Sequence, residues 1–595
     1  MSKPPTGPTA HVDTFARDNL PPIEEWPELL WDLPELDYPP VVNVAAELLD
    51  RHVADGRGER PALRAGATRW SYRELQDAAD RVARVLVEDL GLVPGNRVLL
   101  RGFNDAMTLA CWFGILKAGG IVVATMPLLR ARELAVMAEK ARTRFALCDR
   151  RLAEELELVR GRLEPGFGSR RGGSEGGEIL ERTVGFGPAT GGGPGRAELE
   201  ERMAAKPGGF ENVPTAADDV CLIAFTSGTT GKPKGTMHFH RDVLASADSF
   251  FRGTLPAGPD DVFCGSAPLA FTFGLGMEVV FPLRIGASTV LCEKPTPENL
   301  LQTVQEAGVS VLATAPTAYR AMLPHLARFD LSSLRLCVSA GETLPRPTWE
   351  AWHRATGLGL VDGIGSTEMF HIFISAAGDD IRPGATGRPV RGYRAMVVDD
   401  DFRPLPPGGV GRLAVQGPTG CRYLADERQR EYVVNGWNLT GDTYRVDEDG
   451  YFWFEARSDD MILSSGYNIS GPEVEDALLE HPAVAECAVV ATPDEDRGCL
   501  VKAFVVLARE AGVAGGPAGR GAEAGGVDRA DLVKELQAFV KERIAPYKYP
   551  RAIELVDALP RTETGKVQRF KLRQREEERA RERAAVPAAP RPAAG

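Results

Sequence analysis

The apolar positions in the first part of the chain alternate between helical and strand spacing. Residues 43–55 and 72–90 repeat apolar side chains at the three-to-four-residue interval of an amphipathic helix. A short apolar strand follows at 97–100, then a helix through CWFGILKAGG (111–120) and a second strand in IVVATMP (121–127). Strands that alternate with helices are typical of a parallel sheet covered by helices, so we expect an α/β fold.

The pattern changes after about Arg457. A short strand in DMILSSG precedes a helix that starts at Pro472, and two longer strands follow in AVAECAVVA and CLVKAFVVL. A helix in ADLVKELQAFVKERI and a basic segment complete the series. This order predicts a second, smaller α+β unit of the size of a domain.

Composition shifts suggest where the units begin and end. Two glycine-rich stretches cannot bury enough apolar surface to order themselves, so we interpret 166–195 and 511–526 as loop insertions. The charge run that opens the tail is expected to be a solvated helix face. The predicted units are an N-terminal arm (1–40), a large domain (41–456), a hinge (457–460), a small C-terminal domain (461–573) and a charged, Ala/Pro-rich tail (574–595).

Composition excludes several classes of protein. The 595 residues are 43% hydrophobic and 26% charged, which is ordinary for a globular protein and argues against a disordered or fibrous chain. The formal net charge of −13 argues against nucleic-acid or membrane partners. No apolar run is long enough for a transmembrane helix, and no apolar stretch near the start indicates a signal peptide. The nine scattered cysteines lack CxxC pairs and indicate reduced thiols in the cytoplasm.

The strongest chemical pattern is TSGTTGKPKG at 226–235, directly after an apolar strand at 220–225. Glycines allow close backbone approach, and backbone N–H groups with hydroxyls form an anion-binding concavity. Two lysines add the positive charge that the chain as a whole lacks. The order is not that of a Walker A loop, because Pro233 follows the first lysine. The pattern predicts a loop that binds phosphates.

This loop resembles the phosphate-loop signature of the adenylate-forming superfamily, which includes acyl-CoA synthetases, peptide-synthetase adenylation domains and luciferases. The resemblance extends over nearly the whole chain, with further motifs in the family's order. They are SAGE (339–342), DGIGSTE (362–368), TGD (440–442), RSDD (457–460) and PRTETGK (560–566). The resemblance implies a large N-terminal domain of layered sheets and helices, with parallel α/β subdomains plus a small β subdomain. It also implies a small mobile α+β C-terminal domain.

The resemblance also implies a two-step reaction with ATP, Mg²⁺ and coenzyme A. A carboxylate attacks the α-phosphate of ATP to give an acyl-adenylate and pyrophosphate, and a thiol then displaces AMP. In this family Glu368 would ligate Mg²⁺ together with Thr229, and Thr367 would contact the α-phosphate. The implied ATP-binding residues are Thr226, Ser227, Gly228, Thr229, Thr230, Gly231, Lys232, Lys234, Ala340, Gly341, Glu342, Asp362, Gly363, Ile364, Asp442 and Arg457.

The small domain would supply the remaining catalytic parts. By resemblance, Lys566 bridges the substrate carboxylate and the α-phosphate, which otherwise repel each other. Asp459 would be the hinge about which the small domain rotates between the two half-reactions. Ser465, Gly466 and Tyr467 would lie on the face that admits coenzyme A.

The segment around GSTEMFHIFIS looks closest to benzoate-type and 2-aminobenzoate-type CoA ligases, and the N-terminal HVDTFARDNLPP resembles the second group. A flat, apolar slot would suit an aromatic ring. An ordinary hydrophobic core remains the alternative interpretation of the same residues. The candidate acid-pocket residues are His240, Ala270, Phe271, Phe273, Gly274 and His371.

Two other functions stay open at this point. The first is an adenylating enzyme that loads a fatty or amino acid onto coenzyme A or a carrier protein. The second is a non-catalytic nucleotide-binding regulator, which the retained charged motif residues disfavour. The chain has no HExxH motif, which disfavours a metal hydrolase. The GxSxG match at 172–176, a motif of serine hydrolases, lies inside a glycine-rich stretch with no strand before it. The sequence is compatible with a monomer or a homodimer.

Overall fold

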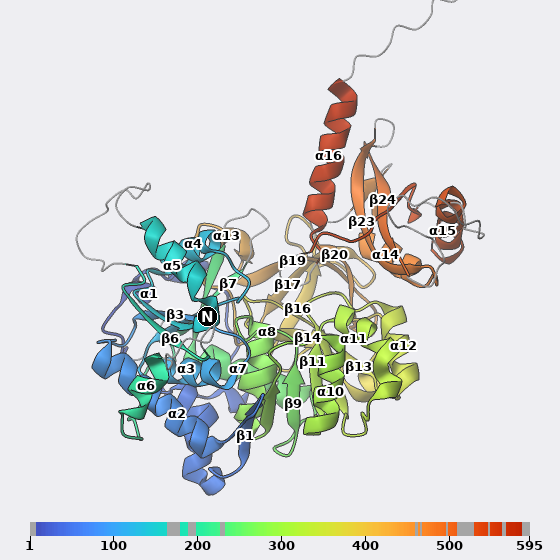
Figure 1. Ribbon diagram of the computed structural model, residues 1–595. Coiled ribbons are helices and arrows are strands. Elements are labelled where there is room, and N and C mark those ends of the chain that lie inside the picture. The colour runs from blue at the N-terminus through green and yellow to red at the C-terminus, as the bar shows by residue number, and fades with distance from the viewer. Residues whose placement is uncertain are drawn as a thin grey trace, which may run out of the picture.

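The computed structural model describes most of the chain. The described residues are 8–163, 179–188, 198–226, 233–457, 462–464, 467–494, 498–508, 529–544, 548–561 and 567–585. A large N-terminal part of sheets and helices carries a smaller α+β C-terminal part, which stands above the strands β17, β19 and β20 in Figure 1. This confirms the predicted fold class.

The first sheet of the large part has the order β6-β5-β3-β4-β7-β8, and all neighbours are parallel except β7 and β8, which form an antiparallel hairpin. Its strands are β3 (Arg97–Arg101), β4 (Ile121–Thr125), β5 (Phe145–Asp149), β6 (Arg182–Phe186), β7 (Val220–Thr226) and β8 (Lys234–Phe239).

The second sheet has the order β15-β14-β13-β12-β11-β9-β10-β1-β2, with parallel pairing from β1 through β13 and antiparallel pairing at the two edges. Its strands are β1 (Pro61–Ala65), β2 (Thr68–Ser71), β9 (Val262–Gly265), β10 (Ser288–Leu291), β11 (Val311–Thr314), β12 (Leu336–Ala340), β13 (Leu360–Gly365), β14 (Ile372–Ser375) and β15 (Arg388–Pro389).

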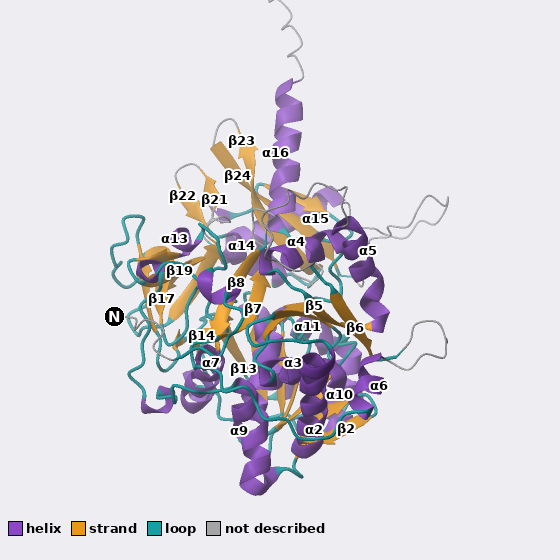
Figure 2. Ribbon diagram, turned by 90° about the vertical axis from the view of Figure 1, so that its left-hand side faces the viewer, coloured by secondary structure: helices purple, strands orange, loops and turns teal. Residues whose placement is uncertain are grey.

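Helices cover both faces of the parallel strands (Figure 2). On β3, Val98 and Leu100 pack into the core cluster of α2 and α3, whereas Leu99 packs into the cluster of α4 and α5. Successive side chains of a strand point to opposite faces, so these contacts place helices on both sides. The helices of this part are α1 (Phe15–Asp18), α2 (Tyr72–Arg84), α3 (Ala106–Lys117), α4 (Ala131–Ala141), α5 (Ala153–Leu163), α6 (Glu198–Ala204), α7 (His240–Gly253), α8 (Thr272–Leu275), α9 (Phe281–Ile285), α10 (Pro297–Ala307), α11 (Pro316–Met322), α12 (Arg346–Thr356) and α13 (Gln429–Tyr432).

Short 3-10 or π segments continue or connect several of these helices. They are η1 (Ile23–Glu25), η2 (Pro34–Leu36), η3 (Ala46–Asp50), η4 (Val53–Arg57), η5 (Val85–Asp89), η6 (Arg150–Leu152), η7 (Gly276–Val280), η8 (Leu323–Arg328) and η9 (Gly378–Asp380). In the described residues, no helix combines the length and apolar character that a membrane span needs.

The third sheet of the large part is antiparallel, and the C-terminal part has its own sheet. The third sheet consists of β16 (Arg394–Val398), β17 (Val410–Gln416), β18 (Val433–Val434), β19 (Trp437–Val446) and β20 (Phe452–Arg457). The C-terminal part contains β21 (Ile462–Ser464), β22 (Tyr467–Ile469), β23 (Val484–Asp494), β24 (Gly498–Leu507), β25 (Ala552–Leu555), α14 (Gly471–Leu479), α15 (Arg529–Arg543) and α16 (Arg569–Ala585).

One strand lies inside a stretch that we expected to be an unstructured insertion. β6 pairs in parallel with β5 within the predicted insertion 166–195. Leu180, Val184 and Phe186 are buried there, so the short apolar run between the glycines has enough apolar surface to join the sheet. The insertion prediction is therefore wrong for 182–186. The second predicted insertion, 511–526, lies outside the described residues.

The boundary predicted at 573 is also corrected, because α16 continues across it to Ala585. Part of its charge run is not solvated. Glu576 is buried and accepts hydrogen bonds from Lys502 Nζ and Thr492 Oγ1, both at 2.9 Å. Lys502 is a buried cation on β24 and requires such a partner, which explains why this carboxylate packs inward.

The N-terminal residues 8–40 lie along the large part and reach the third sheet. Leu29 forms a parallel bridge with Gly417, and Glu28 N donates to Gly436 O at 2.8 Å. Trp26 is buried beside Phe239, with ring centroids 5.8 Å apart. This arm therefore connects the first and third sheets.

A short segment, Cys421–Leu424, binds to the free edge of β8. Met237 N donates to Arg422 O and Leu424 N donates to Gly235 O, both at 2.8 Å. The Arg422 side chain forms an ion pair with Asp242 at 2.8 Å, and both side chains are fully buried. Its guanidinium also lies 4.2 Å from the centroid of the Phe239 ring. These contacts fix the third sheet against the β7–β8 hairpin.

Replacing Arg422 with Met leaves the Asp242 carboxylate buried without its cation. We therefore expect the free energy of unfolding of the large domain to fall by about 3–5 kcal/mol, measured by urea denaturation. Arg403→Met is the control, because Arg403 forms an exposed ion pair with Asp401 and such pairs contribute little. An equal response of the two variants would contradict the importance of the buried pair.

Candidate active site

The motif residues of the second sheet meet at one edge. Gly341 and Glu342 follow β12, which ends at Ala340, and Ser366–Glu368 follow β13. These neighbouring strands are parallel, with Ala340 opposite Gly363. The carboxyl ends of parallel strands lie at the same edge of a sheet, where α/β proteins bind ligands. Gly341 has a φ of +88°, which favours glycine at this turn. The residues predicted to bind the adenine and Glu368 therefore lie at the same edge of the second sheet.

The predicted phosphate loop starts and ends beside this edge. Thr226 and Lys234 are paired across the β7–β8 hairpin. The Nε2 of His238, on β8, lies 2.8 Å from the carbonyl oxygen of Thr367. Burial lowers the pKa of His238 to about 4, so the ring is neutral and donates this hydrogen bond. Of the seven residues between Thr226 and Lys234, six lie outside the described residues, namely Ser227, Gly228, Thr229, Thr230, Gly231 and Lys232.

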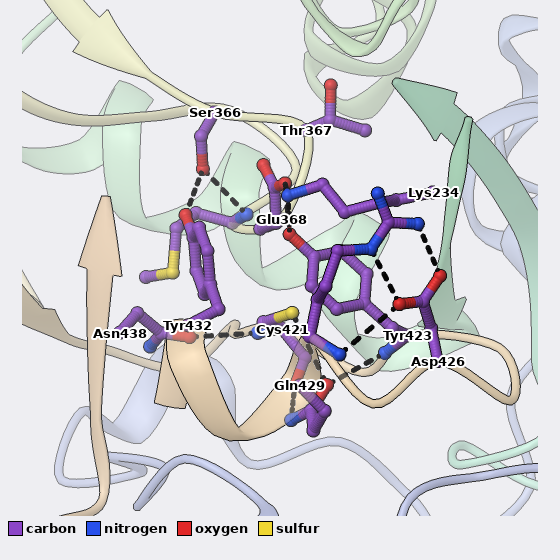
Figure 3. Close-up of polar contacts among 12 residues, drawn as sticks. Lys234, Ser366, Thr367, Glu368, Cys421, Tyr423, Asp426, Gln429, Tyr432 and Asn438 are labelled. Atoms are coloured by element: carbon purple, nitrogen blue, oxygen red, sulfur yellow. Dashed lines mark hydrogen bonds and ion pairs between the residues drawn. The ribbon is translucent and has the colours of Figure 1, made fainter. Parts of the chain in front are cut away.

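Three side chains from three separate segments converge in the centre of Figure 3. Lys234 Nζ donates to the Tyr423 hydroxyl at 2.8 Å, and this hydroxyl donates to Glu368 Oε1 at 2.6 Å. Lys234 Nζ lies 3.8 Å from the same carboxylate oxygen. The structure thus brings the predicted Lys234 and Glu368 together, but adds a tyrosine between them that the sequence analysis missed.

A second tyrosine supports this cluster. The Tyr432 hydroxyl is 3.2 Å from Ser366 Oγ, and Ser366 Oγ also accepts from Met369 N at 3.2 Å. Lys234 Nζ lies 4.7 Å from the centroid of the Tyr423 ring and 5.8 Å from that of Tyr432. Both rings therefore present their π-electrons to the ammonium. Burial raises the pKa of both tyrosines, so both keep their protons.

The residues predicted to bind the ribose, Asp442 and Arg457, belong to the third sheet. Asp442 on β19 is opposite Arg457 on β20, and Asp442 is buried. Asp442 is also close enough to Tyr432 to raise its pKa electrostatically. Of Arg457 the structure describes the backbone in β20. Asp442 and Glu368 are therefore both within electrostatic reach of Tyr432.

The candidate acid-pocket residues divide into two groups. Phe273, on α8, and His371, before β14, lie together, with ring centroids 5.8 Å apart. His371 also meets Phe281 edge-on at 4.3 Å, and burial lowers its pKa to about 3, so it is neutral. Phe271 and Ala270 lie in the segment just before α8 and are partly exposed.

Two of the pocket expectations need a different explanation. A Cβ on Gly274 would lie 2.4 Å from Pro268 O, so this glycine is required by a neighbouring backbone and not by an open slot. The Nδ1 of His240 accepts a hydrogen bond from Val44 N at 3.1 Å in a fully buried position. This contact favours a structural role for His240, whereas His238 reaches the site.

Several predicted residues of the C-terminal part lie outside the described residues, namely Lys566, Asp459, Ser465 and Gly466. Tyr467 is described by its backbone in β22. Arg569, on α16, carries an electrostatic interaction with Glu342 of the adenine-side turn and an ion pair with Glu475 at 2.6 Å. The small domain is thus oriented with the start of α16 toward the large-domain site.

Glu368 is the candidate ligand for a magnesium ion. Among the described residues, no group of three or more His, Cys, Asp or Glu side chains could hold a metal. Mg²⁺ usually keeps several waters and binds through one or two carboxylates together with substrate phosphates. A single buried carboxylate beside a phosphate loop fits that chemistry.

Comparison with known proteins agrees with the architecture and with the site. The model of the AMP-binding enzyme family matches residues 50–423, and that of the AMP-binding enzyme C-terminal domain matches residues 473–566. The fold and the site define the class of adenylate-forming enzymes, which confirms the resemblance seen in the motifs. The chain belongs to the AMP-binding enzyme family.

Among its relatives, benzoate–CoA ligase of Thauera aromatica is 35% identical over 91% of this chain and 97% of its own length. The 4-hydroxybenzoate–CoA/benzoate–CoA ligase of Rhodopseudomonas palustris is 34% identical, with 91% and 95% covered.

Among solved structures, the anthranilate CoA ligase AuaEII in complex with anthranoyl-AMP has a TM-score of 0.83 and 34% identity, and covers 92% of this chain and 100% of that one. A benzoate CoA ligase from Burkholderia xenovorans LB400 has a TM-score of 0.76 and 31% identity, with 89% and 100% covered.

The carboxyl group of Asp362 provides a pH test of the site. Burial raises its pKa to about 8 from the usual 3.8, and Oδ1 has no hydrogen-bond partner in the described part of the chain. The folded state therefore binds this proton more tightly than the unfolded state, and stability falls as the pH rises between these two values. Asp362→Asn removes this dependence.

We expect the wild-type protein to lose more unfolding free energy between pH 5 and pH 8 than Asp362→Asn does. Urea denaturation of both proteins at the two pH values measures the difference, in which the titration of all other groups cancels. Parallel pH profiles for the two proteins would contradict a raised pKa at Asp362.

Proposed function

We propose that this protein is an ATP-dependent CoA ligase for an aromatic carboxylic acid such as benzoate or 2-aminobenzoate. The observation that carries the proposal is the convergence of Lys234 and Glu368 beside the carboxyl edge of β13, with Asp442 within electrostatic reach of the neighbouring Tyr432. The aromatic substrate is supported by relatives named for benzoate and anthranilate.

In the first half-reaction, a carboxylate oxygen of the acid attacks the α-phosphorus of ATP, and the bond to the β-phosphate breaks to release pyrophosphate. Lys234 and the loop 226–234 hold the β- and γ-phosphates, and Thr367 contacts the α-phosphate. Asp442 accepts hydrogen bonds from the ribose hydroxyls, because a carboxylate can take two donors. Arg457 adds a ribose or phosphate contact.

Glu368 would hold Mg²⁺, with Thr229 as a second oxygen ligand; this ion, when bound, neutralises charge on the phosphates. Lys566 bridges the attacking carboxylate and the α-phosphate. Positioned cations supply most of the rate acceleration, because charge is redistributed over phosphate oxygens in the transition state. The adenine lies beside Ala340–Glu342 and Asp362–Ile364.

In the second half-reaction, the thiolate of coenzyme A attacks the acyl carbon, and AMP leaves. We propose that the small domain turns about Asp459 for this step, so that Ser465, Gly466 and Tyr467 face coenzyme A. The domain limits 41–456, 457–460 and 461–573 are part of this proposal, with the smaller domain extended through α16.

The ring of the acid is proposed to lie against Phe271, Phe273 and Ala270. His371 is neutral at all physiological pH values, because burial lowers its pKa to about 3. A neutral imidazole can hydrogen-bond a ring substituent without charging the pocket. A cytoplasmic location is proposed from the nine cysteines, which are all free thiols.

An acid panel tests the substrate class. We expect benzoate and 2-aminobenzoate to release pyrophosphate at least about tenfold faster than acetate or palmitate, because an aromatic ring fills an apolar pocket that small or long chains do not match. Assays with and without coenzyme A separate the half-reactions. A preference for palmitate would reject the aromatic pocket.

Lys566→Ala tests whether Lys566 acts in the adenylation step and not in the transfer to coenzyme A. We expect at least about 100-fold slower adenylation, measured by exchange of pyrophosphate into ATP, because the two reacting anions lose their shared cation. Coenzyme A transfer from a supplied acyl-adenylate should remain within threefold or so of wild type. Lys571→Ala, on α16, is the control. Normal exchange in Lys566→Ala would show that this lysine has another role.

A further inference from the structure

The hydroxyl of Tyr423 lies between the two charged groups of the site. It accepts from Lys234 Nζ at 2.8 Å and donates to Glu368 Oε1 at 2.6 Å, while the two charges themselves stay 3.8 Å apart (Figure 3). A phenol is suited to this position because it is both donor and acceptor. Each charged group therefore has the hydroxyl as its hydrogen-bond partner, and the two charged groups themselves form only a long ion pair at 3.8 Å.

Without that hydroxyl, a shorter, hydrogen-bonded ion pair between Lys234 and Glu368 would be favoured. The Glu368 side chain is 9% exposed and that of Lys234 is 21% exposed, so water screens their attraction only partly. A charge-assisted hydrogen bond between an ammonium and a carboxylate closes to about 2.7–2.9 Å. Such a pair would occupy the ammonium and the carboxylate that the phosphates and the metal require.

Tyr423 is held firmly in this position. Its backbone N donates to Gln429 Oε1 at 2.9 Å, and its backbone forms an antiparallel bridge with Thr236 on β8. Its ring meets that of Tyr432 edge-on, with centroids 5.8 Å apart. The preceding residue, Arg422, makes the buried ion pair with Asp242. The hydroxyl is thus placed by the fold and not by a bound ligand.

We propose that Tyr423 is a positioning residue that holds Lys234 and Glu368 in a long ion pair, prevents them from closing to a direct hydrogen bond, and so keeps both available for MgATP. This inference rests on the proposed roles of Lys234 and Glu368. It predicts that loss of the hydroxyl weakens ground-state binding, because MgATP must then break a preformed ion pair. Once MgATP is bound, the pair is already open, so the chemical step is unaffected.

Tyr423→Phe tests the proposal, since it removes the hydroxyl and keeps the ring beneath the ammonium. We expect Kd for MgATP, measured by calorimetry without acid or coenzyme A, to rise about 10- to 100-fold. The Mg²⁺ concentration for half-maximal binding should rise in parallel. In pyrophosphate release, KM for MgATP should rise while kcat stays within about twofold of wild type.

The matched control is Tyr319→Phe. Tyr319 is also fully buried, and its hydroxyl donates to Leu312 O at 2.8 Å, on β11 and away from the cluster. We expect it to lower the melting temperature without changing Kd for MgATP. A fall in kcat with unchanged Kd in Tyr423→Phe would overturn the proposal, and so would an unchanged Kd and kcat.

A double-mutant cycle gives a second criterion that is independent of stability. Without the ammonium of Lys234 there is nothing to pair with Glu368, so Tyr423→Phe should change the Mg²⁺ requirement less than about twofold when added to Lys234→Gln. An undiminished effect in that background would overturn the proposal. These readouts are binding constants, so they remain interpretable even if the protein adenylates no acid. A failure to adenylate any acid would reject the proposed function but not the proposed role of Tyr423.

Discussion

The structure depends on one buried contact, the ion pair between Arg422 and Asp242. Asp242 lies in the first turn of α7, directly after β8, and also accepts a hydrogen bond from Phe239 N. Arg422 lies in the segment that enters the third sheet. Two fully buried charges are costly unless they are paired, so the first and third sheets are held in one arrangement. Tyr423 is the next residue, and its position follows from this arrangement.

The sequence was sufficient to predict the parts of the site that are local. The prediction of a phosphate loop after an apolar strand follows from a short pattern, and Lys234 was found in this way. Glu368 was found through the resemblance of DGIGSTE to a motif of the family. Tyr423 was not predicted, because its role depends on contacts with residues that are distant in the sequence. Glu368 is 55 residues away from Tyr423, and Lys234 is 189 residues away. No local pattern marks such a tyrosine.

The other differences between the sequence-based predictions and the structure also arise from features that no local pattern marks. Of the two histidines after the phosphate loop, His240 was chosen for the pocket, whereas His238 reaches Thr367. His238 lies in β8, whereas His240 is the first residue of α7, so the residue at which the strand ends determines which histidine reaches the site. Likewise β6 and the buried Glu576 were missed, because their burial depends on β5 and on Lys502, which lie far away in the sequence.

The N-terminal arm has a consequence for how the enzyme is made. Gln429, which holds the Tyr423 backbone, also donates to Glu25 O at 2.9 Å, across 404 residues of chain. Contacts of such long separation form late, since the intervening chain must be present first. The residues around Glu25 must therefore wait until Gln429 has been synthesised before they reach their place, and a nascent chain that ends before Asp442 lacks part of the proposed nucleotide site.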